Sequence, residues 1–201
     1  MAQNTKIIPT NTELQIASDT NFFDVKRELT SKVINILEQY GDKLLQEIIT
    51  PVFQERGIKK NGLKVSKGEN FKGYPYIVLD CPRLFSTHTE VICRTIFRWG
   101  HGWSLHFTVQ GKTFTRVNHS LPDFSASLNR DWLLYTGDNI WEQDVDSVFF
   151  VPMFSMTEAA FSQTIKRQVF CKIATQINLS DAVEWPPFPQ QTYQVLFDLL
   201  K

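Results

Sequence analysis

Apolar residues follow two different spacings along this 201-residue chain, and the change between them limits the possible folds more than any other feature. Between Phe22 and Val52 they recur every three or four positions, which predicts helical structure over residues 22–56. Residues 74–151 instead hold short apolar runs between turn residues, which predicts mainly strands. Residues 155–201 return to the helical spacing. This order favours an α+β fold, in which a central antiparallel sheet (a meander) is flanked by N-terminal and C-terminal helices.

The first helical region carries signals for its own boundaries. Gly41 and Pro51 interrupt it, so we expect one helix to about Tyr40 and a second helix, or a bent continuation, to about Thr50. Residues 1–20 are polar and lack a sustained period, which predicts a loose N-terminal arm.

The second helical region is expected to begin at Ser155, because Ser155 and Glu158 have the spacing of a capping box. Five apolar residues then follow at four-residue steps: Phe161, Ile165, Val169, Ile173 and Ile177. They predict one helix over residues 155–178, which covers one face of the sheet together with the helix over residues 22–50. Pro189 is placed as the first residue of a terminal helix.

Turn residues divide the central region into short segments. The predicted strands are Leu63–Ser66 at a sheet edge, Tyr76–Leu79, Val91–Trp99, Trp103–Val109, Lys112–Val117 and Val148–Val151. Asp131–Tyr135 is predicted to be a helical turn.

The sequence Gly100-His101-Gly102 predicts a hairpin turn and a register for its two strands. Centring the turn on His101 pairs Trp99 with Trp103 and Phe97 with Leu105. The apolar side chains of both strands then share one face, and the polar side chains share the other.

That polar face holds most of the candidate ligand-binding residues. The four candidates are Arg83, Arg94, Arg98 and His106. In the expected register His106 lies diagonally between Arg94 and Arg98, where the three could hold a carboxylate or a phosphate. The alternative is structural: the two arginines pair with acids such as Asp144 or Asp146.

Composition limits the classes of protein. The chain has 21 Lys+Arg against 21 Asp+Glu, 42% hydrophobic and 13% aromatic residues, which excludes a disordered chain and a polycationic arm. One domain over residues 1–201 is expected. The basic connector Arg56–Lys72 is interpreted as a solvated loop; a phosphate-binding or nucleic-acid surface is the alternative, and zero net charge disfavours nucleic acid.

Cysteine usage and the first residues predict the compartment. Cys81, Cys93 and Cys171 are odd in number and form no CxxC pair, which favours buried, reduced thiols over a disulfide framework or a zinc site. No apolar segment follows Lys6 to form a secretory signal, and no run is long enough to cross a membrane. A cytoplasmic protein without metal or cofactor is expected.

Catalytic signatures are not found in the sequence. It contains neither GxSxG nor HExxH, and its histidines do not form a ligand pair: His88, His101, His106 and His119. Cys81 lies beside Asp80 and near Arg83, which could perturb a thiol, although a strand end with a turn at Pro82 is the favoured interpretation. Enzyme status stays open, with the balance against catalysis.

Two central segments resemble a group of uncharacterised bacterial proteins. They are Gly73–Arg83 (GYPYIVLDCPR) and Arg94–His101 (RTIFRWGH), within the central third of the chain. The resemblance implies a bacterial cytosolic protein and carries no activity with it.

Two classes of function therefore remain. The first is a non-catalytic binding or interaction module with a protein partner, in which the surplus of aromatic residues lines a groove or a dimer face. The second is an enzyme or small-ligand protein with an anion-recognising pocket.

Overall fold

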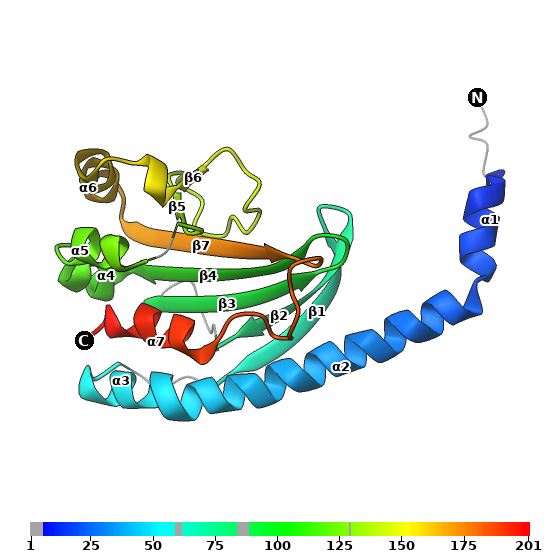
Figure 1. Cartoon of the computed structure of the whole chain (residues 1–201), viewed down its shortest axis with the longest axis horizontal. Coiled ribbons are helices and arrows are strands. Elements are labelled where there is room, and N and C mark those ends of the chain that lie inside the picture. The colour runs from blue at the N-terminus through cyan, green and yellow to red at the C-terminus, as the bar shows by residue number, and fades with distance from the viewer. Residues whose placement is uncertain (1–5, 59–61, 84–88, 129) are drawn as a thin grey trace.

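A computed structural model describes residues 6–58, 62–83, 89–128 and 130–201 (Figure 1). The strands are β1 (Lys64–Phe71), β2 (Tyr74–Asp80), β3 (Val91–Arg98), β4 (Gly102–Gln110), β5 (Leu133–Tyr135), β6 (Phe150–Pro152) and β7 (Phe170–Asn178). The α-helices are α1 (Asn11–Ser18), α2 (Thr20–Leu44), α3 (Thr50–Glu55), α4 (Gly111–Val117), α5 (Leu121–Ser127), α6 (Glu158–Arg167) and α7 (Gln190–Asp198). A π-helical turn, η1 (Leu45–Ile49), joins α2 to α3, and a 3-10 turn, η2 (Met153–Ser155), precedes α6.

The seven strands form one antiparallel sheet in the order β1-β2-β3-β4-β7-β5-β6. This confirms the α+β class and the central antiparallel sheet. Strands β1 to β4 form a meander, whereas β7 is inserted between β4 and β5 although it comes last in the chain. β1 is an edge strand, as the lysines around Leu63–Ser66 predicted, and it extends to Phe71.

One face of the sheet is apolar and is covered by α2, η1, α3 and α7 (Figure 1). The ring of Phe197 in α7 lies 5.4 Å from that of Phe107 in β4, and Leu37 in α2 is fully buried. Gly41 lets α2 approach the sheet closely, because a Cβ atom there would lie only 2.9 Å from Leu79 Cδ1. This layer holds most of the core.

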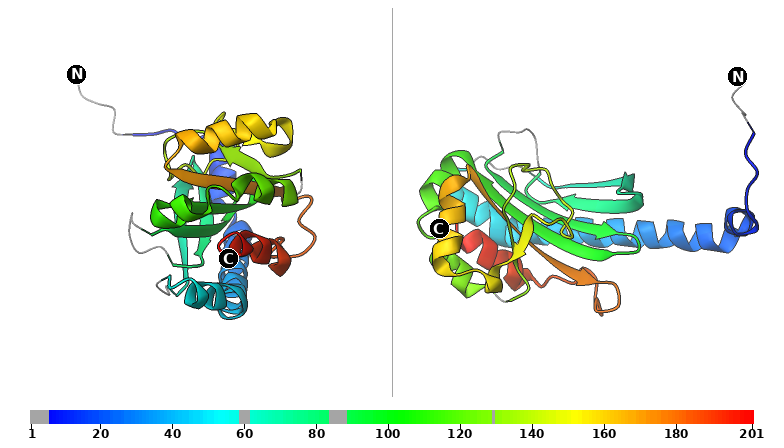
Figure 2. Two further views of the ribbon diagram at one scale, coloured as in Figure 1. Left: turned by 90° about the vertical axis from the view of Figure 1, so that its left-hand side faces the viewer. Right: turned by 90° about the horizontal axis from the view of Figure 1, so that it is seen from above.

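The opposite face of the sheet, which we call the polar face, carries the charged side chains together with a smaller hydrophobic cluster around Tyr135 and Phe150, and it is covered by the segment 136–149, which connects β5 to β6. Helices α4, α5 and α6 gather at one end of the sheet, near α7 (Figures 1 and 2). At the other end α2 continues beyond the sheet, and its first turns and α1 project away from the body (Figures 1 and 2).

The predicted helix over residues 155–178 is wrong in its second half. Helix α6 ends at Arg167, and β7 follows as an inner strand of the sheet. The N-cap is Thr157, whose hydroxyl accepts from the Ala160 N–H, and not Ser155, whose hydroxyl donates to the Pro152 carbonyl. The helices that cover the apolar face are therefore those of residues 20–55 and 190–198, not α6.

Two shorter predictions are also wrong. Lys112–Val117 is helix α4, because the Glu90 carboxylate accepts from the N–H of Thr113 in its first turn at 2.8 Å. Asp131–Tyr135 is not a helical turn, since β5 pairs there with both β6 and β7.

The N-terminal arm and the first helical region also differ from expectation. The arm is helical from Asn11, because Thr10 and Glu13 form a capping box. Pro51 does not end the helical region: it lies in the first turn of α3, where a missing N–H is tolerated.

The predicted hairpin register is shifted by two residues. Phe97 pairs with Trp103 and Arg98 with Gly102, so Trp99 lies outside the strands. Because two residues are one full period of a strand, the composition of each face is nevertheless as predicted.

Candidate functional site

The candidate residues lie on the polar face of the sheet, beneath the segment 136–149. Arg94 stands directly opposite His106, rather than opposite Thr108 as the expected register required. Asp80 stands opposite Arg94 on the other side, in β2. Lys172 joins them from β7, where it pairs with Thr108. Four neighbouring strands thus bring four ionisable side chains to one face.

Arg94 is bound to Asp80 through two hydrogen bonds. Its Nε donates to Asp80 Oδ1 at 2.6 Å and its Nη2 to Asp80 Oδ2 at 3.2 Å. This fork-to-fork pairing holds the guanidinium in one orientation. Among the described residues, nothing accepts a hydrogen bond from the remaining terminal nitrogen, Nη1.

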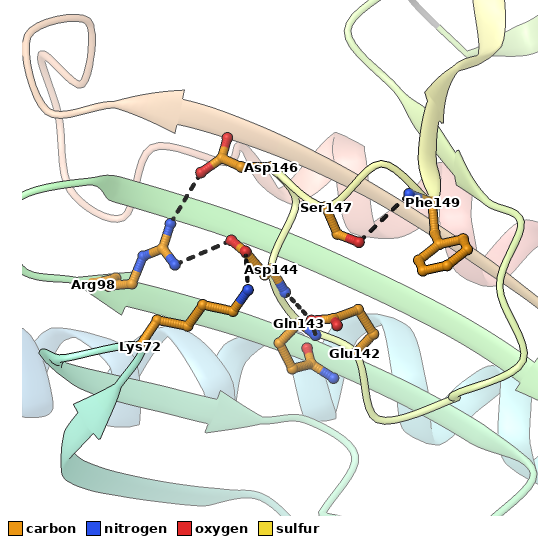
Figure 3. A network of polar contacts seen from close by, with 8 residues as sticks. All are labelled: Lys72, Arg98, Glu142, Gln143, Asp144, Asp146, Ser147 and Phe149. Atoms are coloured by element: carbon orange, nitrogen blue, oxygen red, sulfur yellow. Dashed lines mark hydrogen bonds and ion pairs between the residues drawn. The ribbon is translucent and has the colours of Figure 1, made fainter.

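Arg98 is bound to acids of the covering segment, as the structural alternative expected (Figure 3). Its Nη1 donates to Asp144 at 3.3 Å and its Nη2 to Asp146 at 3.4 Å. Lys72 lies 2.7 Å from the second oxygen of Asp144. Burial raises the pKa of Asp144, but the hydrogen bonds from Lys72 and Arg98 outweigh it and hold that pKa below its ordinary value. Arg98 therefore fastens the segment to the sheet.

Lys172 also holds the covering segment, from inside. Its side chain is completely buried, and its Nζ donates to the carbonyls of Ile140, at 2.9 Å, and of Glu142. The rings of Tyr135 and Phe150 face the ammonium at 5.5 Å and 6.0 Å. Burial, and then the charge of Arg94, lower the pKa of Lys172 to about 7, although Glu142 opposes this.

His106 is buried and uncharged at neutral pH. Burial, followed by the charges of Lys172, Arg94 and Arg98, lowers the pKa of His106 well below its ordinary value. Its Nε2 lies 3.0 Å from Ser104 Oγ, and its buried Nδ1 has no hydrogen-bond partner in the described part of the chain. It is a packed core histidine and not a surface ligand.

A cavity of about 230 Å³ opens beside Arg94. Its lining consists of one charged residue and mostly aromatic, aliphatic and amide side chains: Asn70, Phe71, Tyr76, Val78, Arg94, Ile96, Trp141 and Gln143. Trp141 and Gln143 come from the covering segment, and the others come from β1, β2 and β3. The buried Gln143 Oε1 has no hydrogen-bond partner among the described residues. The cavity thus combines aromatic walls with one guanidinium group.

The remaining sequence candidates lie elsewhere. Arg83 follows β2 and is exposed, and it does not line the cavity. Cys81, Cys93 and Cys171 are free, buried thiols. Burial raises the pKa of Cys81, and likewise that of Cys171, to about 12, so neither thiol has thiolate character at neutral pH.

Two findings concern the expectations about a metal site and about membrane-spanning segments. Within the described ranges, no three His, Cys, Asp or Glu side chains lie close enough together to hold a metal ion. His88, Lys59 and Lys60 fall outside those ranges. Over the same ranges, no helix combines the length and the apolarity needed to span a membrane.

Sequence reasoning located Arg94, Arg98 and His106 on one face but missed Asp80 and Lys172 beside them, and Trp141, which lines the cavity. Asp80 could have been found, because it directly follows the predicted strand Tyr76–Leu79 and has the right parity to face Arg94. Lys172 could not, since its segment was predicted to be helical. Trp141 carries no signal, because a long connection places it over the sheet.

Comparison with known proteins adds no relative: no family model, no curated protein and no solved structure matches this chain.

Proposed function

We propose that this protein is a non-catalytic binding module whose ligand is a small aromatic carboxylate held in the cavity beside Arg94. The observation that carries the proposal is the lining of the cavity. It offers a guanidinium and aromatic walls, but among the described residues it includes no Asp, Glu, His, Cys, Lys or Ser side chain. Such a site can bind and orient a ligand, and apart from the phenol of Tyr76 it offers neither a nucleophile nor a carboxylate or imidazole base.

The anionic part of the ligand follows from the charges near Arg94. Asp80 accepts from two of the three guanidinium nitrogens of Arg94, and we assign the third, Nη1, which has no acceptor among the described residues, to a carboxylate oxygen of the ligand. Asp80 balances Arg94, and Glu142 opposes the charge of the nearby Lys172, whose ammonium donates to carbonyl oxygens. With a pKa of about 7, Lys172 is half protonated at neutral pH and gains charge below it, so the local field becomes more positive as the pH falls and then favours an anion.

The aromatic part of the ligand follows from the walls and the size of the cavity. Phe71, Tyr76 and Trp141 present ring surfaces on which a planar ring can stack. The volume is below the range of about 300–1,000 Å³ that drug-sized ligands occupy, so the ligand is one ring with one or two substituents.

A thermal-shift comparison of benzoate with benzamide tests this proposal. Both have the same ring, but only benzoate carries the charge that Nη1 and the local field select. For a dissociation constant of about 1 mM, about 10 mM benzoate adds about 1.4 kcal/mol of stability and raises Tm by about 3 °C. Benzamide is expected to raise Tm by less than half as much.

Three single variants test whether benzoate binds in the cavity beside Arg94. Trp141→Ala removes an aromatic wall and is expected to abolish the benzoate shift, and Arg94→Lys keeps the pair with Asp80 but loses the fork and weakens the shift. Phe154→Ala, which removes an exposed aromatic side chain outside this cavity, is the control and should shift like the native protein. Equal shifts in all three variants, or no shift with benzoate, would contradict the proposal.

A further inference from the structure

The projecting end of α2 carries an uncovered apolar stripe. Phe22, Phe23 and Val25 are 48%, 47% and 54% exposed, and the two phenylalanine rings pack edge to face at 5.3 Å. Leu14 and Ile16 of α1 are about half exposed as well. From here on we use the arm for residues 11–32, a longer segment than the N-terminal arm predicted over residues 1–20.

The stripe is uncovered because α2 is longer than the sheet on which it packs. Phe22, Val25 and Leu29 continue the helical spacing of Val33 and Leu37, which are buried against the sheet. Lys26 reaches Glu69, near the end of β1, at 3.5 Å. Beyond that contact the helix leaves the sheet, so the same face meets solvent (Figures 1 and 2).

Charge is divided along the arm. Residues 11–25 contain three acids, Glu13, Asp19 and Asp24, and no Lys or Arg. Residues 26–32 contain three bases, Lys26, Arg27 and Lys32, against one acid, Glu28. The outer part of the arm is therefore acidic and the inner part is basic.

We propose that two copies of this chain associate through their arms, with the α2 helices crossing in antiparallel orientation between Val25 and Lys26. In this orientation Asp24 of each copy faces Arg27 of the other and Asp19 faces Lys32, whereas a parallel pair would place like charges together. The apolar residues are placed near the crossing point, so each copy covers the stripe of the other. A two-fold axis through the crossing makes one patch sufficient for both copies.

The charge pattern is what selects a second copy as the occupant. A partner with a uniformly charged helix would match only one part of the arm. An acidic lipid surface would repel residues 11–25, which have no basic side chain. Only a surface with the reverse order of charges matches both parts, and the antiparallel arm itself has that order.

Sedimentation equilibrium of the full chain tests the proposal over about 1 to 500 µM protein. The native protein is expected to move from the 23.3 kDa monomer towards twice that mass as concentration rises. A double variant, Phe22→Ser with Phe23→Ser, is expected to stay monomeric, and at about 1 µM, where both proteins are monomers, to keep the Tm of the native protein, because both side chains are about half exposed and lie outside the core. Val183→Ser, at a 94% exposed valine outside the arm, is the control and should associate like the native protein.

Charge reversals test the antiparallel orientation. Asp24 and Arg27 also pair with each other within one helix, at 2.8 Å. Asp24→Lys and Arg27→Glu are each expected to weaken self-association at least tenfold, because each places like charges across the crossing. A mixture of the two single variants restores opposite charges across the crossing, although the intrahelical pair is lost in both chains, and should associate like the native protein. A native protein that stays monomeric at 500 µM, a double variant at Phe22 and Phe23 that still dimerises, or charge variants that the mixture does not rescue would each overturn the proposal.

Discussion

Lys172 is the residue whose chemistry depends most on the fold. In an unfolded chain its ammonium is hydrated and titrates near pH 10. In the folded protein it is fully buried beneath residues 136–149, and burial, followed by Arg94, lowers its pKa to about 7. The unfolded state therefore binds more protons than the folded state between about pH 7 and about pH 10.

This difference predicts a rise in stability with pH, which Lys172→Met should remove. Stability increases with pH wherever the unfolded state binds more protons, by up to about 1.4 kcal/mol per pH unit for one group. Urea unfolding of both proteins at pH 7, 8 and 9 measures it, since contributions from other groups cancel in the difference. We expect the free energy of unfolding of the native protein, relative to that of the variant, to rise by about 1 kcal/mol per pH unit. A constant difference would mean that Lys172 stays charged in the fold.

The candidate residues show what strand parity can and cannot predict. Arg94, Arg98 and His106 share a face because they lie an even number of residues apart in register, and a register error of two residues preserves this. The same error changes the partners, so His106 was predicted diagonal to Arg94 but stands opposite it. Strand parity does not give the distances between individual side chains, so only the structure shows that Asp80 accepts two hydrogen bonds from Arg94.

At the scale of elements, β7 shows why a regular spacing misled. Apolar residues at steps of four fit a helix, but four is also an even number, so they equally share one face of a strand. Cys171, Ile173, Thr175 and Ile177 lie on the apolar face of β7. Phe161 and Ile165, in the first half of the same run, lie in α6. The sequence pattern alone does not separate the two.

The two halves of that run predict different costs for the same type of truncation. Ile173 is 2% exposed in an inner strand, so Ile173→Ala should lower the free energy of unfolding by about 2–5 kcal/mol. Val169 is 79% exposed between α6 and β7, so Val169→Ala should change it by less than about 0.5 kcal/mol. Denaturant unfolding measures both. Similar large losses would instead support a continuous helix with both residues in the core.

Helix α4 shows a second limit of sequence reasoning. Its residues alternate in a way that is typical of a strand, and its first turn is stabilised by Glu90, which lies more than twenty residues earlier. Both the N–H and the hydroxyl of Thr113 donate to one carboxylate oxygen, at 2.8 Å and 2.6 Å. Such a long-range cap has no local signature, because the capping side chain comes from a different element.

Across the whole molecule, the sheet separates two kinds of chemistry. Its apolar face packs on helices and supplies the core, and its polar face is closed by a segment without regular structure over residues 136–149. Arg98 and Lys72 hold that segment through ion pairs with Asp144, and Lys172 holds it through hydrogen bonds to its backbone carbonyls. The cavity beside Arg94 exists because this segment places Trp141 over the sheet.

The most direct measurement is therefore a benzoate titration followed through the indole N–H signals of the five tryptophans. Trp141 alone among them lines the cavity beside Arg94. We expect its signal to shift and saturate over about 0.1–20 mM benzoate, as occupancy follows a single-site curve. The signal of Trp185, which is partly buried beside Phe97 on the other face, is expected to stay in place. A Trp141 signal that does not move over that range, or equal drift of all five signals, would contradict binding in this cavity.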